Sequence, residues 1–297
     1  MKVAVTGASG FIASHLVERL LADGHAVTAV DALTDDYDPA VKIRNMAKWV
    51  VHPHVTFLQA DLATCPLDFV EKAEVVFHLA GKAGVRSSYG IEFARYLSDN
   101  LLATQRLLEA KPQRLVFASS SSVYGQVVGL AREDTALVPL SPYGVTKLAC
   151  EHLIRVYGTS AVILRFFSVY GPRQRPDMAF AKFIQAMKRN DSFNVYGDGE
   201  QTRDFTYVGD VVDAVVAAGT KNVVGETFNI GGGLSVTLNA AIAMLERVMC
   251  MPAKSYHVPP PPGDPRNTKA DISKAQHLLG FHPRTSLEEG LKAQVWK

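Results

Sequence analysis

The first half of the chain alternates short apolar runs with longer segments of helical periodicity. Each run has the length of a buried strand, and the runs lie at residues 3–6, 26–30, 55–59, 75–79, 115–118 and 161–167. Helical patterns follow at residues 11–21 and 100–108. Since a strand that is covered on both faces reads as a continuous apolar run, the pattern predicts an α/β fold with a doubly wound parallel sheet.

The simple alternation stops near Phe167, where prolines and glycines become frequent. An apolar helix is predicted at residues 211–218 and a short strand at 227–230, and we expect both to return to the first domain. The predicted larger domain therefore covers residues 1–167 plus about 205–232. A smaller α/β C-terminal domain is predicted for residues 168–204 and 233–297, with helices at 238–249 and 272–279.

Composition narrows the classes of protein that the chain can belong to. Apolar residues make up 47% and charged residues 20% of the 297 residues, as in an ordinary globular protein. The formal charge of +2 provides no general basic field, so we expect no nucleic-acid partner and only local contacts to anions. The chain opens directly with a strand and has no apolar run of membrane-spanning length, so we expect a cytoplasmic protein without membrane attachment.

Cysteine and histidine positions give no indication of a metal site. Cys65, Cys150 and Cys250 are scattered and lack the spacing of zinc ligands. The histidines are scattered too, and none pairs at metal-binding spacing. We therefore expect no metal and interpret the three cysteines as buried thiols in a reducing compartment.

A glycine loop follows the first predicted strand and opens the first predicted helix. It reads Gly7-Ala-Ser-Gly10-Phe11-Ile12-Ala13. Glycines let the backbone turn tightly and approach a pyrophosphate, whose charge then lies at the helix N-terminus. Taken alone such a loop can be only a helix cap, but its place after a strand predicts a dinucleotide site in a Rossmann-type domain.

Residues at the ends of the next strands extend this predicted site. Asp31 ends the second strand, and a carboxylate there accepts the ribose 2′-OH and repels a 2′-phosphate, which favours NAD over NADP; a turn cap is the alternative. After the third and fourth strands we expect contacts to the cofactor from four residues, namely Asp61, Leu62, Leu79 and Ala80. Beside them, Lys82 is assigned to the cofactor and Arg86 to a substrate anion, although both are surface charges in the simpler interpretation.

The stretch from Ser119 to Lys147 carries the expected chemistry. Tyr143 and Lys147 are four residues apart in a predicted helix, so the ammonium of Lys147 can lie near the phenol and lower its pKa. Tyr143 then becomes a general base, and Ser120, at the end of a buried strand, hydrogen-bonds the same substrate oxygen. The same spacing occurs on many amphipathic helices as a packing residue and a solvated charge.

With Gly7, Asp31, Ser120, Tyr143 and Lys147 in this order, the whole chain resembles the extended short-chain dehydrogenase/reductase family of nucleotide-sugar enzymes. The resemblance implies NAD in the N-terminal part, a UDP- or dTDP-sugar in the C-terminal part, and a homodimer formed through two helices per subunit. It also implies nucleotide contacts from four residues, which are Val195, Tyr196, Arg203 and Asp264.

Two of these assignments have alternatives. Arg203 can instead form a salt bridge to Asp204 or Asp210. Relatives often have a basic residue just before the Gly263-Asp264 pair, where this chain has Pro262. One phosphate contact is therefore in question, and Arg266 is the candidate replacement.

Within that family the chain resembles UDP-glucuronate 4-epimerases most closely. The matching segments are 36–39, 83–86, 165–172 and 175–179, the last of which reads Arg-Pro-Asp-Met-Ala. Related dehydratases have Thr-Asp-Glu before Val-Tyr-Gly, and decarboxylases have Glu where Ser122 stands; this chain has only hydroxyls there. The resemblance implies that the sugar carboxylate is surrounded by Ser121, Ser122, Ser168 and Arg175. Arg175 can alternatively be a structural partner of Asp177.

The expected reaction is NAD-dependent 4-epimerisation of UDP-glucuronate to UDP-galacturonate through a 4-keto intermediate. Two alternatives share the fold: a 4-epimerase for neutral UDP-hexoses such as UDP-glucose and UDP-galactose, and a UDP-glucuronate decarboxylase that works without the usual Glu. A third is an NAD-binding sensor that has lost its chemistry, although such proteins typically break the Tyr-Lys pair that this chain keeps.

Overall fold

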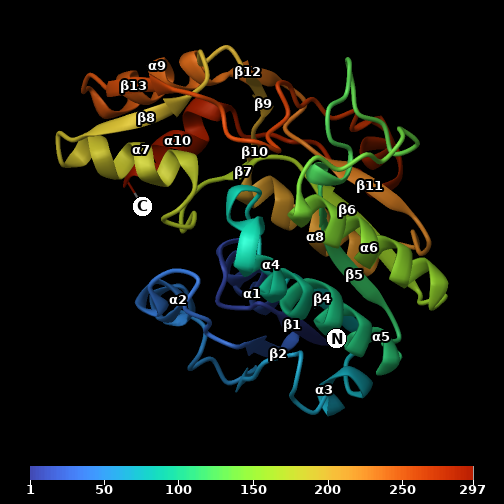
Figure 1. Cartoon of the computed structure of the whole chain (residues 1–297). Helices are drawn as coiled ribbons and strands as arrows, with labels where there is room; N and C mark the ends of the chain where they lie inside the picture. Colours follow the sequence, from blue (N-terminus) through green and yellow to red (C-terminus); the bar gives the residue numbers. More distant parts are fainter. Residues whose placement is uncertain (297) are drawn as a thin grey trace.

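A computed structural model describes residues 1–296. Its central sheet has seven strands, all parallel, in the spatial order β11-β6-β5-β4-β1-β2-β3. Figure 1 shows the sheet with helices on both sides and the C-terminal segments gathered at one end. In chain order the strands are β1 (Lys2–Thr6), β2 (Ala26–Asp31), β3 (Val55–Gln59), β4 (Val75–His78), β5 (Leu115–Ser120), β6 (Ala161–Phe166) and β11 (Thr227–Ile230). The predicted doubly wound parallel sheet is confirmed.

Two layers of helices cover the sheet because successive side chains of each strand point to opposite faces. Val3 and Val5 of β1 pack into one core cluster together with α1 and α8, whereas Ala4 packs into the other cluster with α5 and α6. The helices of these layers are α1 (Phe11–Ala22), α2 (Pro39–Met46), α3 (Asp68–Glu71), α4 (Phe93–Tyr96), α5 (Ala103–Glu109), α6 (Pro142–Val156) and α8 (Val208–Thr220). Burial on both faces explains why the strands read as continuous apolar runs.

A third apolar cluster forms the core of the C-terminal part. Phe183 and Phe193 stack within it at 4.3 Å between ring centroids. Its elements are α7 (Ala179–Lys188), β8 (Ser192–Tyr196), α9 (Leu238–Met249), β13 (Lys254–Val258) and α10 (Leu287–Trp296). Three short pairs of strands lie outside the central sheet: β7 (Val169–Tyr170) with β10 (Thr206–Tyr207), β9 (Thr202–Asp204) with β12 (Ser235–Thr237), and β8 with β13. The assignment of the two domain boundaries stays a prediction.

The strand order places the carboxyl ends of β1 and β4 at a switch point. The chain runs from β1 outward to β3 in one direction and from β4 outward to β11 in the other. In open α/β sheets the crevice beside such a point receives ligands. Gly7, Asp31, Leu79 and Ser120 end or follow four neighbouring strands at this edge.

Several predicted elements differ from the observed ones. The helix that was expected at 100–108 begins at Phe93 and contains a π-helical segment, η3 (Leu97–Leu102), before α5. The turn-rich stretch around residues 195–207 contains β8, β9 and β10, which pair with distant strands. The short helix before Gly280 is observed as the π-helical segment η5 (Ala275–Leu279). Within residues 1–296, no helix has the length and apolarity needed to cross a membrane.

The cysteine prediction is correct for one residue of three. Cys150 is buried in α6, but Cys65 is half-buried and Cys250 is exposed. Cys250 caps the C-terminus of α9 in the left-handed region, at φ 53°.

Candidate active site

The glycine loop lies against the backbone that follows β4. Gly7 has φ +68°, and a Cβ atom there would lie 2.8 Å from the Cα of Ala80, so only glycine fits. Gly10 begins α1, and no side chain of residues 1–296 caps that helix end, so its first amides can receive an anion. The space that a side chain at Gly7 would fill is the feature expected of a pyrophosphate site. Phe11 and Ile12 lie in the first turn of the helix that follows.

Asp31 joins the glycine loop to the end of β2. Its carboxylate is almost fully buried and accepts hydrogen bonds from the Ser9 amide at 2.9 Å and the Leu33 amide at 2.8 Å. Both the turn-cap interpretation and a site for a ribose fit this geometry, because each carboxylate oxygen can accept a further bond. A second negative group, such as a 2′-phosphate, would be repelled by this carboxylate.

The remaining predicted cofactor contacts differ in exposure. Asp61 is exposed and accepts a hydrogen bond from the Ala63 amide, whereas Leu62 packs into the sheet core. Leu79 and Ala80 are half-buried at the end of β4, and the Ala80 amide donates to the Thr6 hydroxyl at 3.2 Å. Leu79 and Ala80 therefore lie beside the glycine loop, as predicted for the end of β4. The role of Asp61 stays a prediction.

Lys82 is paired within the protein. Its ammonium is buried and bridges the carboxylates of Asp36 and Glu92, the second at 3.3 Å. The neighbouring carboxylates raise the pKa of Lys82, although burial acts in the opposite direction. Two acidic partners compensate its charge, so the predicted contact to a cofactor or substrate anion would require this pairing to change.

Tyr143 and Lys147 lie in the first turns of α6, as predicted. The Ser141 hydroxyl caps the helix by accepting from the Gly144 amide at 3.1 Å. A Cβ atom at Gly144 would lie 2.5 Å from the Ser122 carbonyl oxygen, so this glycine lets the helix approach the serine segment. Both Tyr143 and Lys147 are buried at this contact.

The ammonium of Lys147 points to β5. It donates to the Ala118 carbonyl at 2.8 Å and lies 4.9 Å from the centre of the Phe117 ring. Burial raises the pKa of Tyr143, while the Ser120 hydroxyl and the cationic Arg175 act to lower it. Burial also lowers the pKa of Lys147. In this arrangement the ammonium contacts β5, because spacing fixes the face of a helix but not the direction of a long side chain, and the expectation that Lys147 lowers the pKa of Tyr143 stays a prediction.

Two members of the predicted carboxylate site, Arg175 and Ser122, lie near Tyr143 or its helix. Ser120 ends β5 and accepts from the Ser122 amide at 3.1 Å, which holds the short helical turn η4 (Ser121–Val123). Ser121, Ser122 and Ser168 are half-buried. Arg175 acts on the Tyr143 phenol through its charge, but its guanidinium also makes a two-point contact to Asp177 at 3.0 and 2.7 Å. The structural alternative for Arg175 is thus observed, and its carboxylate role stays a prediction.

Three of the four predicted nucleotide contacts lie together with Arg86. The Arg86 guanidinium lies 3.9 Å from the centre of the Tyr196 ring. Asp264 pairs with Arg203 at 3.2 Å and with Arg86 at 3.7 Å, so the expected partners Asp204 and Asp210 are not the ones that Arg203 contacts. We call Arg86, Tyr196, Arg203 and Asp264 the arginine cluster.

The side chains of two further candidates at the nucleotide end lie outside the arginine cluster, and the contacts predicted for them stay predictions. The side chain of Val195 is buried in the C-terminal core, because alternate residues of β8 point inward. Arg266 pairs with Asp198 at 2.8 Å on the surface instead of joining the arginine cluster.

Sequence reasoning missed Asn100. It lies in the π-helical segment η3, donates to the Lys82 carbonyl and the Thr146 hydroxyl at 3.0 Å, and is buried. Its Oδ1 atom has no hydrogen-bond partner within residues 1–296, and a Cβ atom on Gly81 would lie 2.6 Å from it. The sequence offered one indication of Asn100, a polar residue at the start of an apolar helical pattern. Such a residue cannot be distinguished from a helix cap by composition alone.

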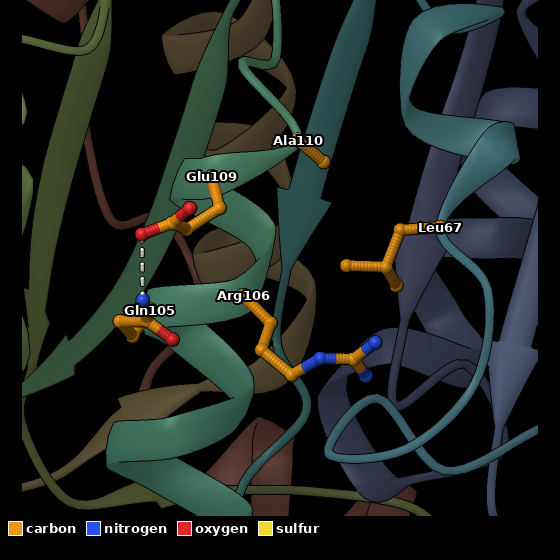
Figure 2. Close-up of a pocket in the computed structure, with 5 residues that line it drawn as sticks. All are labelled: Leu67, Gln105, Arg106, Glu109 and Ala110. Carbon is orange, nitrogen blue, oxygen red and sulfur yellow. Dashed lines mark hydrogen bonds between the residues drawn. The ribbon is translucent and has the colours of Figure 1, made fainter.

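A surface hollow between α5 and the segment before α3 lies away from these residues. Figure 2 shows Arg106 reaching across the hollow towards the segment that carries Leu67, and Gln105 bonded to Glu109. The guanidinium donates to the carbonyl oxygens of Leu62 and Cys65. Its donors serve the fold, and the hollow offers no catalytic group comparable to Tyr143.

Comparison with known proteins gives a consistent result. The family model described as "NAD dependent epimerase/dehydratase family" matches residues 3–231. Two relatives are "Uncharacterized UDP-glucose epimerase YtcB" of Bacillus subtilis, at 44% identity over 99% of this chain and 97% of its own, and "UDP-glucuronate 4-epimerase" of Thermodesulfobacterium geofontis, at 37% over 98% and 94%.

A solved structure agrees with this assignment. The UDP-glucuronic acid 4-epimerase from Bacillus cereus, in complex with UDP-glucuronic acid and NAD, has a TM-score of 0.97 and 42% identity, covering 99% of this chain and 98% of its own. The predicted Rossmann-type fold and the predicted extended family are both confirmed. The chain belongs to the NAD dependent epimerase/dehydratase family.

Proposed function

We propose that the protein is an isomerase that converts UDP-glucuronate to UDP-galacturonate by NAD-dependent epimerisation at C4. The observation that carries the proposal is the buried phenol of Tyr143, which has a serine hydroxyl and the cation of Arg175 beside it. A hydroxyl-lined site with one guanidinium suits an acidic sugar. Relatives whose names give this activity match almost the whole chain.

The residues at the switch point fit NAD. Gly7 and Gly10 leave room for the pyrophosphate, Asp31 has free acceptor capacity for the ribose, and the uncapped end of α1 provides amides. Lys147 is proposed to contact the nicotinamide ribose from α6. When bound, NAD supplies an acceptor and donor of hydride at C4 of the sugar.

Proton transfer is assigned to Tyr143. Its phenolate oxygen takes the proton of the C4 hydroxyl, and the Ser120 hydroxyl hydrogen-bonds the same sugar oxygen. Because burial raises the pKa of the phenol, Arg175 and Ser120 must offset that burial for the base to form. The 4-keto sugar then turns about its diphosphate and presents its other face. Tyr143 returns the proton to the C4 oxygen.

The acid group of the sugar needs restraint as well as binding. A ketone at C4 lies β to the C5 carboxylate, and such an acid loses carbon dioxide when the breaking bond aligns with the ketone π system. Ser121, Ser122, Ser168 and Arg175 are proposed to keep the carboxylate charged and hold it out of that alignment. The group offers no carboxylic acid for elimination, in contrast to the dehydratases.

The arginine cluster is proposed to bind the nucleotide diphosphate. Arg86 and Arg203 share the single carboxylate of Asp264, so one positive charge remains uncompensated within this group. A guanidinium can bind phosphate oxygens in a two-point geometry, and the Tyr196 ring beside Arg86 offers a flat apolar surface. Asp264 is then positioned to accept from a ribose hydroxyl.

The proposal extends to the location and the oligomeric state of the protein. We propose a cytoplasmic homodimer that pairs through the outer faces of two helices per subunit, which are the continuous helix of η3 and α5, and α6. Exposed apolar side chains on these helices, at Leu102, Val145 and Val156, support the pairing. Light scattering during gel filtration would test it, since a monomeric mass at micromolar concentration contradicts a dimer. Residues 1–167 with 205–232 are proposed to bind NAD, and the remainder to bind the UDP-sugar.

Incubation with a panel of UDP-sugars, followed by identification of the products by NMR, tests the proposed activity. UDP-glucuronate should yield UDP-galacturonate without external NAD, because the cofactor is restored in each turnover. A UDP-pentose product would instead identify a decarboxylase, and no turnover of UDP-glucuronate would remove the substrate assignment.

A 4-epimerase for neutral UDP-hexoses is the second candidate. It is favoured by the pairing of Arg175 with Asp177, which neutralises the guanidinium, and by the name of the Bacillus subtilis relative. Turnover of UDP-glucose without turnover of UDP-glucuronate would support it.

A further inference from the structure

The ion pair between Arg175 and Asp177 lies near Tyr143, in the part of the site that we assign to the sugar. The Nε atom of Arg175 donates to Oδ1 of Asp177 at 3.0 Å, and Nη2 donates to Oδ2 at 2.7 Å. Nη2 also donates to the Ala83 carbonyl at 3.0 Å. The Nε and Nη2 donors are therefore used by the protein, so neither edge of the guanidinium is left free for a two-point contact to another carboxylate.

One nitrogen of the guanidinium is available. Nη1 of Arg175 makes no hydrogen bond to residues 1–296, and its positive charge is felt at the buried phenol of Tyr143. The Arg175 side chain is 20% exposed, whereas Asp177 is 48% exposed. A sugar carboxylate approaching Nη1 thus meets a cation that already has one carboxylate partner, and the second negative charge lowers the attraction.

The local sequence makes this pairing difficult to avoid. Asp177 is two residues from Arg175, with Pro176 between them, and the Met178 amide donates to the Arg175 carbonyl at 3.0 Å in a closed turn just before α7. The fixed φ of proline and the turn hold the two side chains on the same side. The pair is built into the segment and does not depend on a chance meeting of long side chains.

We propose that Asp177 is a specificity-determining residue that weakens the binding of acidic UDP-sugars relative to neutral ones. It acts by competing with the sugar carboxylate for the charge of Arg175. The inference rests on the proposed function, because it assigns the C5 substituent of the sugar to the surroundings of Arg175. It predicts that the site discriminates only weakly between UDP-glucuronate and UDP-glucose.

The test is Asp177→Asn, which removes the charge and keeps the size of the side chain. Dissociation constants for UDP-glucuronate and UDP-glucose are measured by calorimetry on NAD-loaded protein in a Tyr143→Phe background, so that no turnover occurs. Because the competing carboxylate is half-exposed, the constant for UDP-glucuronate should fall about two- to fivefold. The constant for UDP-glucose should stay within the error of the measurement.

Two matched variants exclude other causes. Asp213→Asn removes one charge from an exposed ion pair between Asp213 of α8 and Arg19 of α1, and it should change neither constant. In an Arg175→Ala background, Asp177→Asn should lose its effect on UDP-glucuronate, because the charge for which the two carboxylates compete is absent.

Three results would overturn the inference: tighter binding of both sugars, weaker binding of UDP-glucuronate, or no change in either constant. The binding constants are independent of turnover. A protein that binds UDP-glucuronate more tightly after Asp177→Asn, but whose parent forms no UDP-galacturonate, would refute the proposed reaction and keep the specificity role. If UDP-glucuronate binds to neither protein, both ideas fail.

Discussion

Replacing Glu151 by Gln should destabilise the protein strongly, because this carboxylate is fully buried against a buried arginine. Arg165 is 1% exposed and donates to the two oxygens of Glu151 at 3.0 and 2.7 Å. The Ser119 hydroxyl donates to the same carboxylate at 2.6 Å. Glu151→Gln keeps the shape but leaves the guanidinium of Arg165 without a counter-charge in the interior.

The magnitude follows from the burial of the pair. Removing one partner of a buried ion pair costs about 3–5 kcal/mol, because the remaining charge stays desolvated. For a chain of this size each kcal/mol corresponds to roughly 2–3 °C in Tm, so the expected decrease is about 6–15 °C. Ser119 is the neighbour of Ser120, so the change should also lower kcat by loosening the proposed catalytic serine.

The effect should depend on pH in a defined direction. Burial alone would raise the pKa of Glu151, but the hydrogen bonds from Arg165 and Ser119 override it and hold the pKa below its ordinary value. A carboxyl group whose pKa is lowered on folding stabilises the protein above its unfolded pKa, and this contribution is lost as the pH falls through the folded pKa. The difference in Tm between parent and variant should therefore shrink under acidic conditions.

Thermal unfolding followed by circular dichroism measures this, with Glu288→Gln as the control. Glu288 pairs with Lys292 at 2.6 Å on the exposed face of α10, and its replacement should leave Tm unchanged. If Glu151→Gln changed Tm no more than the control at neutral pH, the argument from the buried pair would be refuted.

Three further predictions concern the site. Tyr143→Phe should reduce turnover of UDP-glucuronate by about 10²–10⁴-fold and leave NAD bound, as measured by product NMR and by cofactor release on denaturation; unchanged turnover would contradict the assigned base. Gly7→Ala should abolish NAD retention, because its Cβ would lie 2.8 Å from the Ala80 backbone at φ +68°; a variant that purified with full NAD would contradict the cradle. Arg175→Ala removes an influence that lowers the pKa of Tyr143, so the rising limb of the pH–rate profile should move to higher pH, and a shift in the other direction would count against it.

The sheet could be predicted because its strands are buried on both faces. The strand at Val55–Gln59 and the returning strand at Thr227–Ile230 have the predicted bounds, since apolar runs between turn residues leave little choice of boundary. Strands of the C-terminal part were harder to predict. β13 (Lys254–Val258) is exposed along most of its length and is a strand because it pairs with β8, which lies far away in the sequence.

The candidate site shows the same division between pattern and geometry. Motif spacing identified the Tyr143 and Lys147 pair and the serine segment, and it placed them at the carboxyl ends of parallel strands. It could not show that Lys147 donates to Ala118 of β5 rather than approaching the phenol. Sequence reasoning also could not show that Arg86 and Arg203 share the carboxylate of Asp264. Each of the three residues is more than sixty positions from the other two in the sequence.

The charged residues at the two ends of the site are expected to contribute differently, one end to the affinity for the nucleotide and the other to the selectivity for the sugar. At the nucleotide end, Arg86 and Arg203 share one carboxylate, that of Asp264, and the surplus positive charge is available to a diphosphate. Every UDP-sugar carries that diphosphate, so this end contributes affinity without selecting the sugar. At the proposed sugar end, Arg175 is matched by Asp177, so we expect its guanidinium to add only a small attraction for an acidic sugar. From the proposed role of Asp177 we expect a single change in its charge to alter the selectivity between acidic and neutral sugars while the affinity for the nucleotide stays the same.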